Sequence, residues 1–362
     1  MRKIEITFLS NYSWDAPNVL ELLCETASFL DDEIRYFSKP VSIFKNKEKN
    51  NSPLTNIECN KLYNISVKFS KIPLIRLLQD YIIEKQIFKI NPKIKKRILF
   101  FNNLDSLKNQ SEKMKEYFDK LVFLCEDYSE INDRLISNCK IADCILVIPK
   151  TMLSILKKVY PEKRIVLWPQ PTSCQNIEIL KQENKNLLDK LLENIPEPRI
   201  IYSGYGLNRL NREVYMKCAS HFKNYSFLSF GDKTTDSRNN MYIIPPVSKP
   251  EMLYIISKCQ IGFMPYDISD PHNKHCVPLK LFDYFSIGIP VVSSKLININ
   301  HMNDIIYLCG TCEEFICAID SSLKESKVSS NRQRRKQIYK YHNTKERSND
   351  LKLLIDQLLD SH

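Results

Sequence analysis

The sequence predicts an α/β protein made of two doubly wound domains. Short apolar runs alternate with stretches of helical periodicity along the chain, which is the pattern of parallel sheets covered by helices. This alternation stops at the proline-containing segment Ile195–Arg199 and then starts again. The length of 362 residues also suits two domains of ordinary size.

The first predicted domain covers residues 1–195. We expect strands in its apolar runs, at Lys3–Ser10, Glu33–Ser38, Arg97–Asn103, Lys120–Cys125, Cys144–Pro149 and Arg164–Pro169. Predicted helices between them include Pro17–Leu30, Pro73–Lys85 and Met152–Tyr160. The segment Lys39–Ser70 is polar and irregular, and we expect a loop region or a small insertion there.

The second predicted domain covers residues 196–342 and repeats the alternation of strands and helices. Its strands are expected at Arg199–Ser203, Tyr225–Phe230, Met241–Pro245, Ile261–Pro265, Pro290–Ser293 and Ile305–Leu308. Its helices are expected at Arg212–Phe222, Pro250–Lys258, Leu279–Ser286 and Glu313–Ser322. A final helix at 343–362 has Asn343 as a plausible N-cap, with Glu346 three residues later.

Composition excludes several classes of protein. No segment approaches the ~18 consecutive apolar residues of a membrane span. The start MRKIEITFLS contains Glu5 and is too short an apolar run for a signal peptide, so we expect a cytoplasmic protein. Most of the twelve cysteines stand singly in apolar runs and are expected to be reduced core residues. Cys309 and Cys312 form a CxxC pair, and Cys317 follows about one helical turn later, but no fourth zinc ligand stands at suitable spacing.

Positive charge is concentrated in one stretch of the first domain. The net charge is +11, and Lys61–Arg97 holds ten Lys or Arg against two acids. Because its apolar residues have helical spacing, this segment suits anionic lipid headgroups, a phosphorylated acceptor or nucleic acid, as well as a solvated basic face. A second basic run, RQRRKQIYK near the C-terminus, is expected to form the surface of a helix.

The segment PLKLFDYFSIGIPVVSS, Pro278–Ser294, carries the strongest functional pattern. It reads as a helix that ends at Gly288 and is followed by a buried strand. Lys280 and Asp283 are three residues apart and therefore share one face near the helix N-terminus. A positive helix end, a lysine and a carboxylate can together hold a phosphate and a ribose. The plainer alternative is an ion pair between Lys280 and Asp283 on the surface.

This segment resembles the donor-binding domain of the GT-B glycosyltransferases, in which a carboxylate stands five residues before a glycine and x-P-V-V follows. The stretches IIYSGYGLNRLNREV and NNMYIIPPVSKPEMLYIISKCQIGFMPYD extend the resemblance through the second domain. KIADCILVIPKTML and LVFLCEDYSEI extend it more weakly into the first. The nearest relatives it suggests are bacterial polysaccharide glycosyltransferases akin to the glucuronosyltransferase of xanthan assembly. The resemblance implies two Rossmann-like domains that face a cleft, with the helix at 343–362 crossing back to the first domain.

The resemblance also implies how the donor-binding residues are used. Lys280 would meet the diphosphate of a nucleotide-sugar, together with the backbone amides around Leu279 and Lys280 at the helix start that Pro278 introduces. Asp283 would bind the ribose, and the strand end at Val247 would present backbone groups to a pyrimidine.

A turn after the first strand of the second domain offers further phosphate contacts. Gly204 and Gly206 let the backbone approach a phosphate, with Arg209 or Arg212 as the countercharge. Because position 209 is not glycine, the dinucleotide fingerprint is incomplete, which argues against a nicotinamide enzyme.

The resemblance favours an inverting mechanism, since His275 stands where many retaining members have a glutamate. Inverting transfer needs a base in the first domain. The candidates are Glu126, then Asp127, then Asp15, each of which follows an apolar strand and could instead cap a helix. There is no DxD motif, so we expect neither a metal nor a cofactor to be required.

Together these features predict a cytoplasmic, metal-independent glycosyltransferase of hexosyltransferase type. It would move a sugar from a UDP-sugar to a hydroxyl of a glycan or lipid-linked glycan in cell-surface polysaccharide synthesis. Its partners would be this donor, this acceptor and, peripherally, the anionic inner face of a membrane, with no nucleic acid. Three alternatives stay open: a nucleotide-sugar epimerase of the same fold, a non-catalytic nucleotide-sugar-binding partner subunit and a basic RNA-associated protein. The RNA-associated protein would differ from the others in its indifference to UDP.

Overall fold

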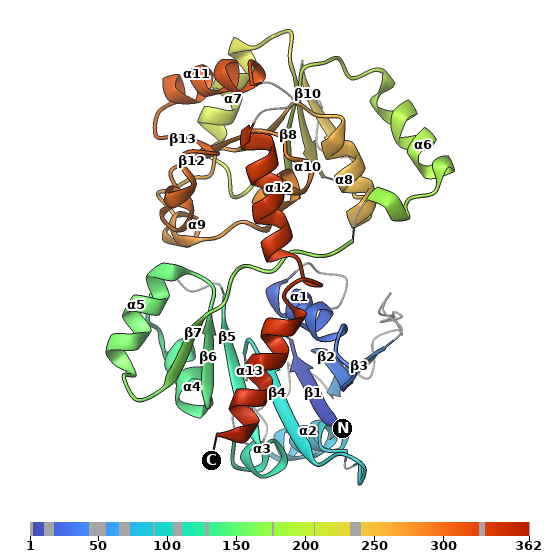
Figure 1. The fold of residues 1–362 in the computed structure, drawn as a ribbon, viewed down its shortest axis with the longest axis vertical. Coiled ribbons are helices and arrows are strands. Elements are labelled where there is room, and N and C mark those ends of the chain that lie inside the picture. Colours follow the sequence, from blue (N-terminus) through green and yellow to red (C-terminus); the bar gives the residue numbers. More distant parts are fainter. Residues whose placement is uncertain are drawn as a thin grey trace. The chain divides into compact units, whose positions relative to one another are not determined.

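The structure, a computed structural model, describes residues 3–10, 18–42, 56–64, 73–89, 91–103, 111–126, 130–175, 177–205, 207–231, 240–325 and 330–361. The chain forms two compact units (Figure 1). The first unit contains Met1–Pro171 and Thr344–His362, and the second contains Thr172–Asn343.

The first unit is built on a seven-stranded sheet with the order β3-β2-β1-β4-β5-β6-β7. All neighbouring strands are parallel. The strands are β1 (Ile4–Leu9), β2 (Glu33–Ser42), β3 (Ile57–Asn64), β4 (Lys96–Phe101), β5 (Lys120–Cys125), β6 (Cys144–Val147) and β7 (Arg164–Leu167). The six predicted strands are present. Within Lys39–Ser70, where we expect a loop region or a small insertion, the structure has the additional strand β3, and positions 43–55 and 65–70 lie outside the described residues. Of the described side chains of the edge strand β3, only Ile57 and Leu62 are buried, so this strand lacks a clear apolar pattern.

Helices cover this sheet, and the C-terminal helix is among them. They are α1 (Val19–Ala27), α2 (Pro73–Ile87), α3 (Ser111–Tyr117), α4 (Asp133–Ile141), α5 (Lys150–Val159) and α13 (Ser348–Asp360). Figure 1 shows α13 beside α1, and these two helices are in contact. Thr344 Oγ1 donates a hydrogen bond to buried Glu25 Oε1 at 2.7 Å just before α13 begins. The prediction that Asn343 caps this helix is wrong, since Arg347 stands at the N-cap.

The second unit has a six-stranded sheet with the order β10-β9-β8-β11-β12-β13, all parallel. The strands are β8 (Arg199–Tyr205), β9 (Ser226–Phe230), β10 (Met241–Ile244), β11 (Ile261–Met264), β12 (Val291–Ser294) and β13 (Tyr307–Cys309). The predicted α/β class is therefore confirmed. Because the strand order reverses between β8 and β11, the crevice at their carboxyl ends is where such a sheet binds ligands.

The helices of the second unit surround this sheet. They are α6 (Gln182–Glu193), α7 (Arg212–His221), α8 (Lys249–Ser257), α9 (Pro271–His275), α10 (Leu279–Ile287), α11 (Cys312–Leu323) and α12 (Ser330–His342), with 3₁₀ turns η3 (Ile177–Ile179) and η4 (Ile297–Met302). None of the helices in the described part of the chain combines the length and apolar character that crossing a bilayer requires.

The chain enters the second unit earlier than the expected boundary after residue 195. The reason is α6, whose Leu188 and Leu192 belong to the core of the second unit. Tyr254 of α8 also donates a hydrogen bond to Asp189 of α6 at 3.0 Å. These contacts place the segment 172–195 with the second sheet.

The sequence predicts that the basic run in α12 forms the surface of a helix, but one of its arginines is buried. Arg335 is fully buried, and its guanidinium pairs with both oxygens of Glu325 at 2.7 and 2.8 Å. Its Nε also donates to the carbonyl of Ile305 at 2.9 Å. This set of acceptors matches the planar fork of arginine and allows a charged side chain to be buried.

We predict that Glu325→Ala lowers the free energy of unfolding by about 3 kcal/mol or more, since it leaves the Arg335 charge buried and unpaired. Urea denaturation measures this loss. Asp304→Ala is the matched control, because Asp304 pairs with Arg334, the neighbour of Arg335 on α12, in an exposed ion pair whose removal should change stability little. Equal effects of the two substitutions would contradict the structural role of Arg335.

Candidate functional site

The N-terminus of α10 begins as predicted, at Leu279, with Pro278 in the N-cap position. The pyrrolidine ring of Pro278 offers no acceptor for the first N–H groups of the helix. The helix ends at Gly288, whose φ of 82° is the left-handed conformation that glycine adopts without strain. The predicted helix, its start and its glycine stop are thus confirmed, and its positive end is available to an anion.

Lys280 extends from α10 toward two tyrosines, Tyr202 in β8 and Tyr266 just after β11. Its Nζ donates a hydrogen bond to Tyr266 Oη at 2.7 Å. The ammonium lies 5.0 Å from the ring centroid of Tyr202 and 5.3 Å from that of Tyr266. Burial, reinforced by the positive charge of Arg209, lowers the pKa of Lys280 to about 8. A nearby anion would restore the charged form of this lysine.

Arg209 is the second cation at this place. Backbone pairing of Leu210 with Tyr266 holds its loop against the end of β11. Its Nε donates to Asn273 Oδ1 at 2.9 Å, and its guanidinium lies 5.8 Å from the Tyr266 ring centroid. Its Nη2 is buried and has no hydrogen-bond partner among the described residues. A buried donor without a partner is costly, so this nitrogen favours a ligand oxygen.

Asp283 is buried and pairs with Lys249, the first residue of α8. Since Lys280 turns to Tyr266 instead, the alternative of a surface Lys280–Asp283 pair is not what the structure shows. Val247 is two residues before Lys249 and packs, partly buried, against the core. The helix that follows Val247, α8, is in contact with α10, which carries Asp283. The separate predicted roles of the two residues, Val247 at the pyrimidine and Asp283 at the ribose, stay predictions.

Gly204 lies near the end of β8, next to the Tyr202 ring. A Cβ at this position would stand 2.5 Å from the end of that ring. Gly204 thus leaves room for the ring of Tyr202, which lies against the Lys280 ammonium. This explains a glycine at position 204 independently of the predicted approach of a phosphate. Gly206 is outside the described residues, and Arg212 is exposed at the start of α7.

Glu126, the first candidate base, lies at the carboxyl edge of the other sheet, directly after β5. Its Oε1 accepts a hydrogen bond from Asn102 Nδ2 at 2.8 Å, and its Oε2 accepts one from the N–H of Val19 at 3.2 Å. Asn132, not Glu126, caps the following helix α4. These bonds from Asn102 and Val19 hold the Glu126 carboxylate in place and connect the end of β5 to the start of α1. Asp127 and Asp15 lie outside the described residues.

Sequence reasoning missed four side chains of the site in the second unit: Tyr202, Tyr266, Asn273 and Lys249. Tyr266 follows an apolar strand in GFMPYD, so its place at a strand end was a usable signal. The pairing of Lys249 with Asp283 spans 34 residues, and no local pattern indicates it.

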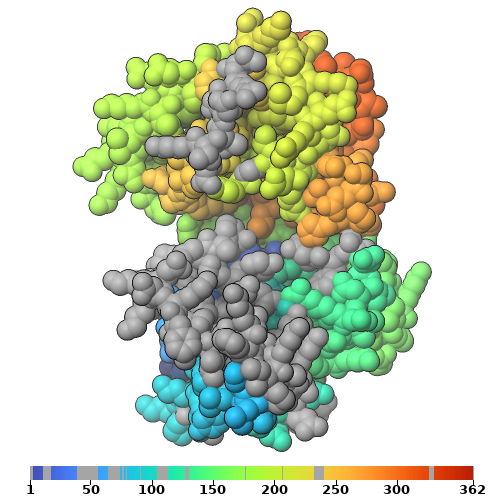
Figure 2. Space-filling view, turned by 180° about the vertical axis from the view of Figure 1, so that it is seen from behind, coloured from blue at the N-terminus to red at the C-terminus, as the bar shows by residue number. Residues whose placement is uncertain are grey.

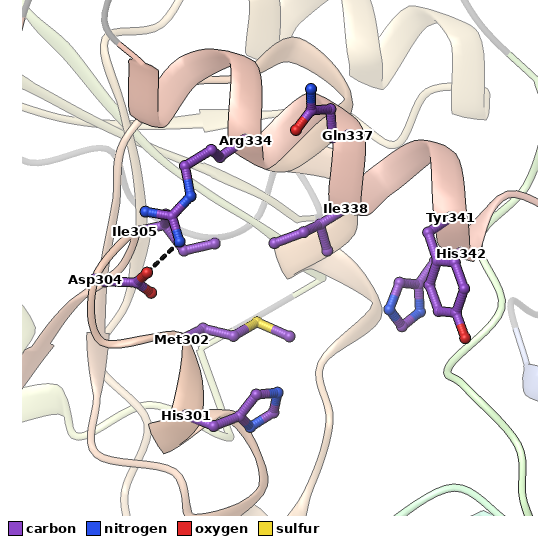
Figure 3. A pocket seen from close by; sticks show the side chains of 9 residues that line it. All are labelled: His301, Met302, Asp304, Ile305, Arg334, Gln337, Ile338, Tyr341 and His342. Atoms are coloured by element: carbon purple, nitrogen blue, oxygen red, sulfur yellow. Dashed lines mark hydrogen bonds and ion pairs between the residues drawn. The ribbon is translucent and has the colours of Figure 1, made fainter.

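A separate cavity of about 490 Å³ lies beside α12 (Figure 3). Figure 3 shows side chains of α12 on one side and of the segment 301–305 on the other. Its lining consists of His301, Met302, Asp304, Ile305, Arg334, Gln337, Ile338, Tyr341 and His342. None of these is a predicted site residue, and Arg334 is already paired with Asp304.

Metal-ligating side chains are scattered rather than clustered. In the described ranges, no group of three or more His, Cys, Asp or Glu could hold a metal ion. The twelve cysteines all lie within these ranges, and each is a free thiol. Cys309 is buried while Cys317 is exposed.

No family model matches the sequence, and no curated protein matches it. Solved structures match over nearly the whole chain. Sucrose-phosphate synthase from Thermosynechococcus elongatus has a TM-score of 0.71 at 13% identity, with 100% of both chains covered. Anabaena HepE, solved in complex with UDP and glucose, has a TM-score of 0.69 at 9% identity and covers 98% of this chain and 99% of its own. An α,α-trehalose-phosphate synthase (UDP-forming) from Burkholderia xenovorans, in complex with glucose-6-phosphate, has a TM-score of 0.65 at 10% identity, with 98% and 99% covered.

At identities near 10% these likenesses establish the fold. The narrower resemblance to the xanthan glucuronosyltransferase stays a prediction. The chain has the fold of the GT-B glycosyltransferases.

Proposed function

We propose that this chain is a glycosyltransferase that takes its sugar from a nucleoside-diphosphate donor, a UDP-sugar. The observation that carries this proposal is the pair of cations, Lys280 and Arg209, on the ring of Tyr266. They lie with the start of α10 at the strand reversal of the second sheet, where the fold binds ligands. A diphosphate supplies both the charge and the oxygens that this site lacks.

Each residue of the donor site has a part in this proposal. The first N–H groups of α10, at Leu279 and Lys280, and the guanidinium of Arg209 hold the diphosphate. Asp283, fixed by Lys249, accepts hydrogen bonds from the ribose through its remaining lone pairs. The backbone near Val247 meets the pyrimidine. A UDP complex of HepE and the UDP-forming synthase, both of similar fold, support the choice of uridine.

Transfer inverts the anomeric centre and needs no metal in this proposal. Glu126 removes the proton from an acceptor hydroxyl as that oxygen attacks the anomeric carbon and the bond to UDP breaks. Lys280, Arg209 and the helix end stabilise the negative charge that develops on the departing diphosphate. The acceptor is a glycan or a lipid-linked glycan of a cell-surface polysaccharide, and the enzyme works in the cytoplasm. Asp127 and Asp15 are the second and third candidates for the base.

We predict that the wild-type protein binds UDP in preference to GDP and ADP, and that Lys280→Ala weakens UDP binding about tenfold to 100-fold by removing a charge-assisted contact. Arg209→Met should have a similar effect. Isothermal titration calorimetry gives the dissociation constants. Lys274→Ala, an exposed lysine of α9 in the same unit, is the control and should bind UDP as the wild type does.

Absence of nucleotide binding by the wild type would overturn the proposed function. If UDP affinity is unchanged in both Lys280→Ala and Arg209→Met, the protein binds UDP, but not at the site that these two residues form. Binding without any release of UDP from a panel of UDP-sugars and acceptors would instead favour a non-catalytic partner subunit, and interconversion of the donor without an acceptor would favour an epimerase.

Glu126→Ala should retain UDP affinity and lose transfer by about 100-fold or more, because the acceptor proton then has no base. The same change leaves the Val19 N–H without this acceptor, so thermal unfolding is followed in parallel. Asn102→Ala serves as the matched variant, since it removes one hydrogen bond to Glu126 but keeps the carboxylate. Full activity of Glu126→Ala would place the base elsewhere, with Asp127 tested next.

A further inference from the structure

Helix α2 of the first unit exposes a row of large apolar side chains. Leu74 is 77% exposed, Leu77 67%, Leu78 52% and Tyr81 55%. Their spacing of i, i+3, i+4 and i+7 places all four on one face of the helix. Figure 2 shows α2, in light blue, at the surface of the first unit. Contiguous exposed apolar side chains of this kind mark an interaction surface.

The opposite face of α2 already holds the helix on the domain. Ile83 and Ile87 are buried in the core of the first unit. Gln86 exchanges two hydrogen bonds, at 3.0 and 3.1 Å, with the main chain of Tyr63 in the edge strand β3. Buried Arg35 donates to the carbonyl of Ile87 at 3.1 Å. The outward row is therefore not needed to attach the helix.

Positive charges adjoin the apolar row. The ammonium of Lys85 lies 5.5 Å from the ring centroid of Tyr81. Lys89, Lys93 and Lys95 are exposed and follow the C-terminal end of the helix. The nearby acid Glu84 is neutralised by Lys113 at 2.8 Å. Lys85 therefore adjoins the apolar row directly, and further exposed lysines follow at the C-terminal end of the same helix.

We propose that this face of α2, the docking face formed by Leu74, Leu77, Leu78, Tyr81 and Lys85, binds the surface of an anionic lipid bilayer. The leucines enter the boundary between headgroups and acyl chains, Tyr81 lies at the headgroup level, and the lysines contact lipid phosphates. A second copy of the chain would bring like charges together across the same face, and nucleic acid offers no apolar phase for three leucines. The binding is independent of the nucleotide site, so it holds whether or not the second unit takes UDP.

Flotation of the full chain with vesicles tests this proposal. The vesicles are phosphatidylcholine alone and an equimolar mixture of phosphatidylcholine with phosphatidylglycerol. We expect binding to the mixture, weakened by salt and much lower on phosphatidylcholine alone. The triple variant Leu74→Gln, Leu77→Gln, Leu78→Gln should bind at least about tenfold less.

A double variant, Lys85→Gln with Lys89→Gln, tests the charges separately and should lose about fivefold per lysine. The matched control is Leu187→Gln with Leu191→Gln on α6, whose leucines are 65% and 40% exposed. It should bind vesicles as the wild type does. Because the substituted leucines are exposed, all variants should keep the wild-type melting temperature and UDP affinity. If the triple variant unfolds, the lysine variant decides the question.

Failure of the wild type to bind the mixed vesicles would overturn the proposal. Undiminished binding by the triple and double variants would do so as well, as would an equal loss in the α6 control. A dimer in light scattering that dissociates in the triple variant would assign the docking face to a second copy instead. Binding to RNA that the lysine variant abolishes and the leucine variant leaves intact would also contradict the membrane assignment.

Discussion

The ring of Tyr266 holds two positive charges at one edge of the second sheet, and the site depends on this contact. Lys280 donates to its hydroxyl, and Arg209 lies within 5.8 Å of its centroid. The charges repel each other, and burial adds to the cost of keeping Lys280 protonated. The fold maintains this arrangement through backbone pairing of Leu210 with Tyr266 and through Asn273. A ligand with several negative oxygens, such as a diphosphate, stabilises two cations held this close together more than a neutral ligand would.

Local patterns in the sequence were enough for the fold class and for the helix that begins the site. The start of α10 at Leu279 and its end at Gly288 follow from short-range chemistry, a proline before the helix and a glycine after it. Long-range contacts were not accessible in the same way. The strand β3, the hydrogen bond of buried Arg335 to Ile305 and the end of the first unit at Pro171 each depend on residues well separated in the chain. The GT-B resemblance supplied the overall architecture that such patterns cannot.

The candidate site shows the same difference between features that local sequence predicts and contacts that it does not. The positions of Lys280 and Asp283 on one helix followed from their spacing, but their partners did not, since one side chain turns to the sheet and the other to α8. The basic segment of the first domain is a similar case. Periodicity identified an amphipathic helix, yet α2 has two apolar faces, and only the structure distinguishes the buried one at Ile83 from the exposed one at Leu77. Spacing gives the angle between residues but not the direction in which a face points.

Proton uptake on UDP binding tests the central claim most directly. Calorimetry at pH 8 in two buffers of different ionisation enthalpy measures it, at a pH where the phosphates of UDP are fully ionised. With a pKa of about 8, Lys280 is roughly half protonated in the free protein, and an anion beside it raises this pKa. Binding should therefore take up about half a proton at pH 8, much less at pH 7, and almost none in Lys280→Met. UDP binding without proton uptake at pH 8 would mean that the diphosphate does not contact Lys280, and the assignment of the site would fail.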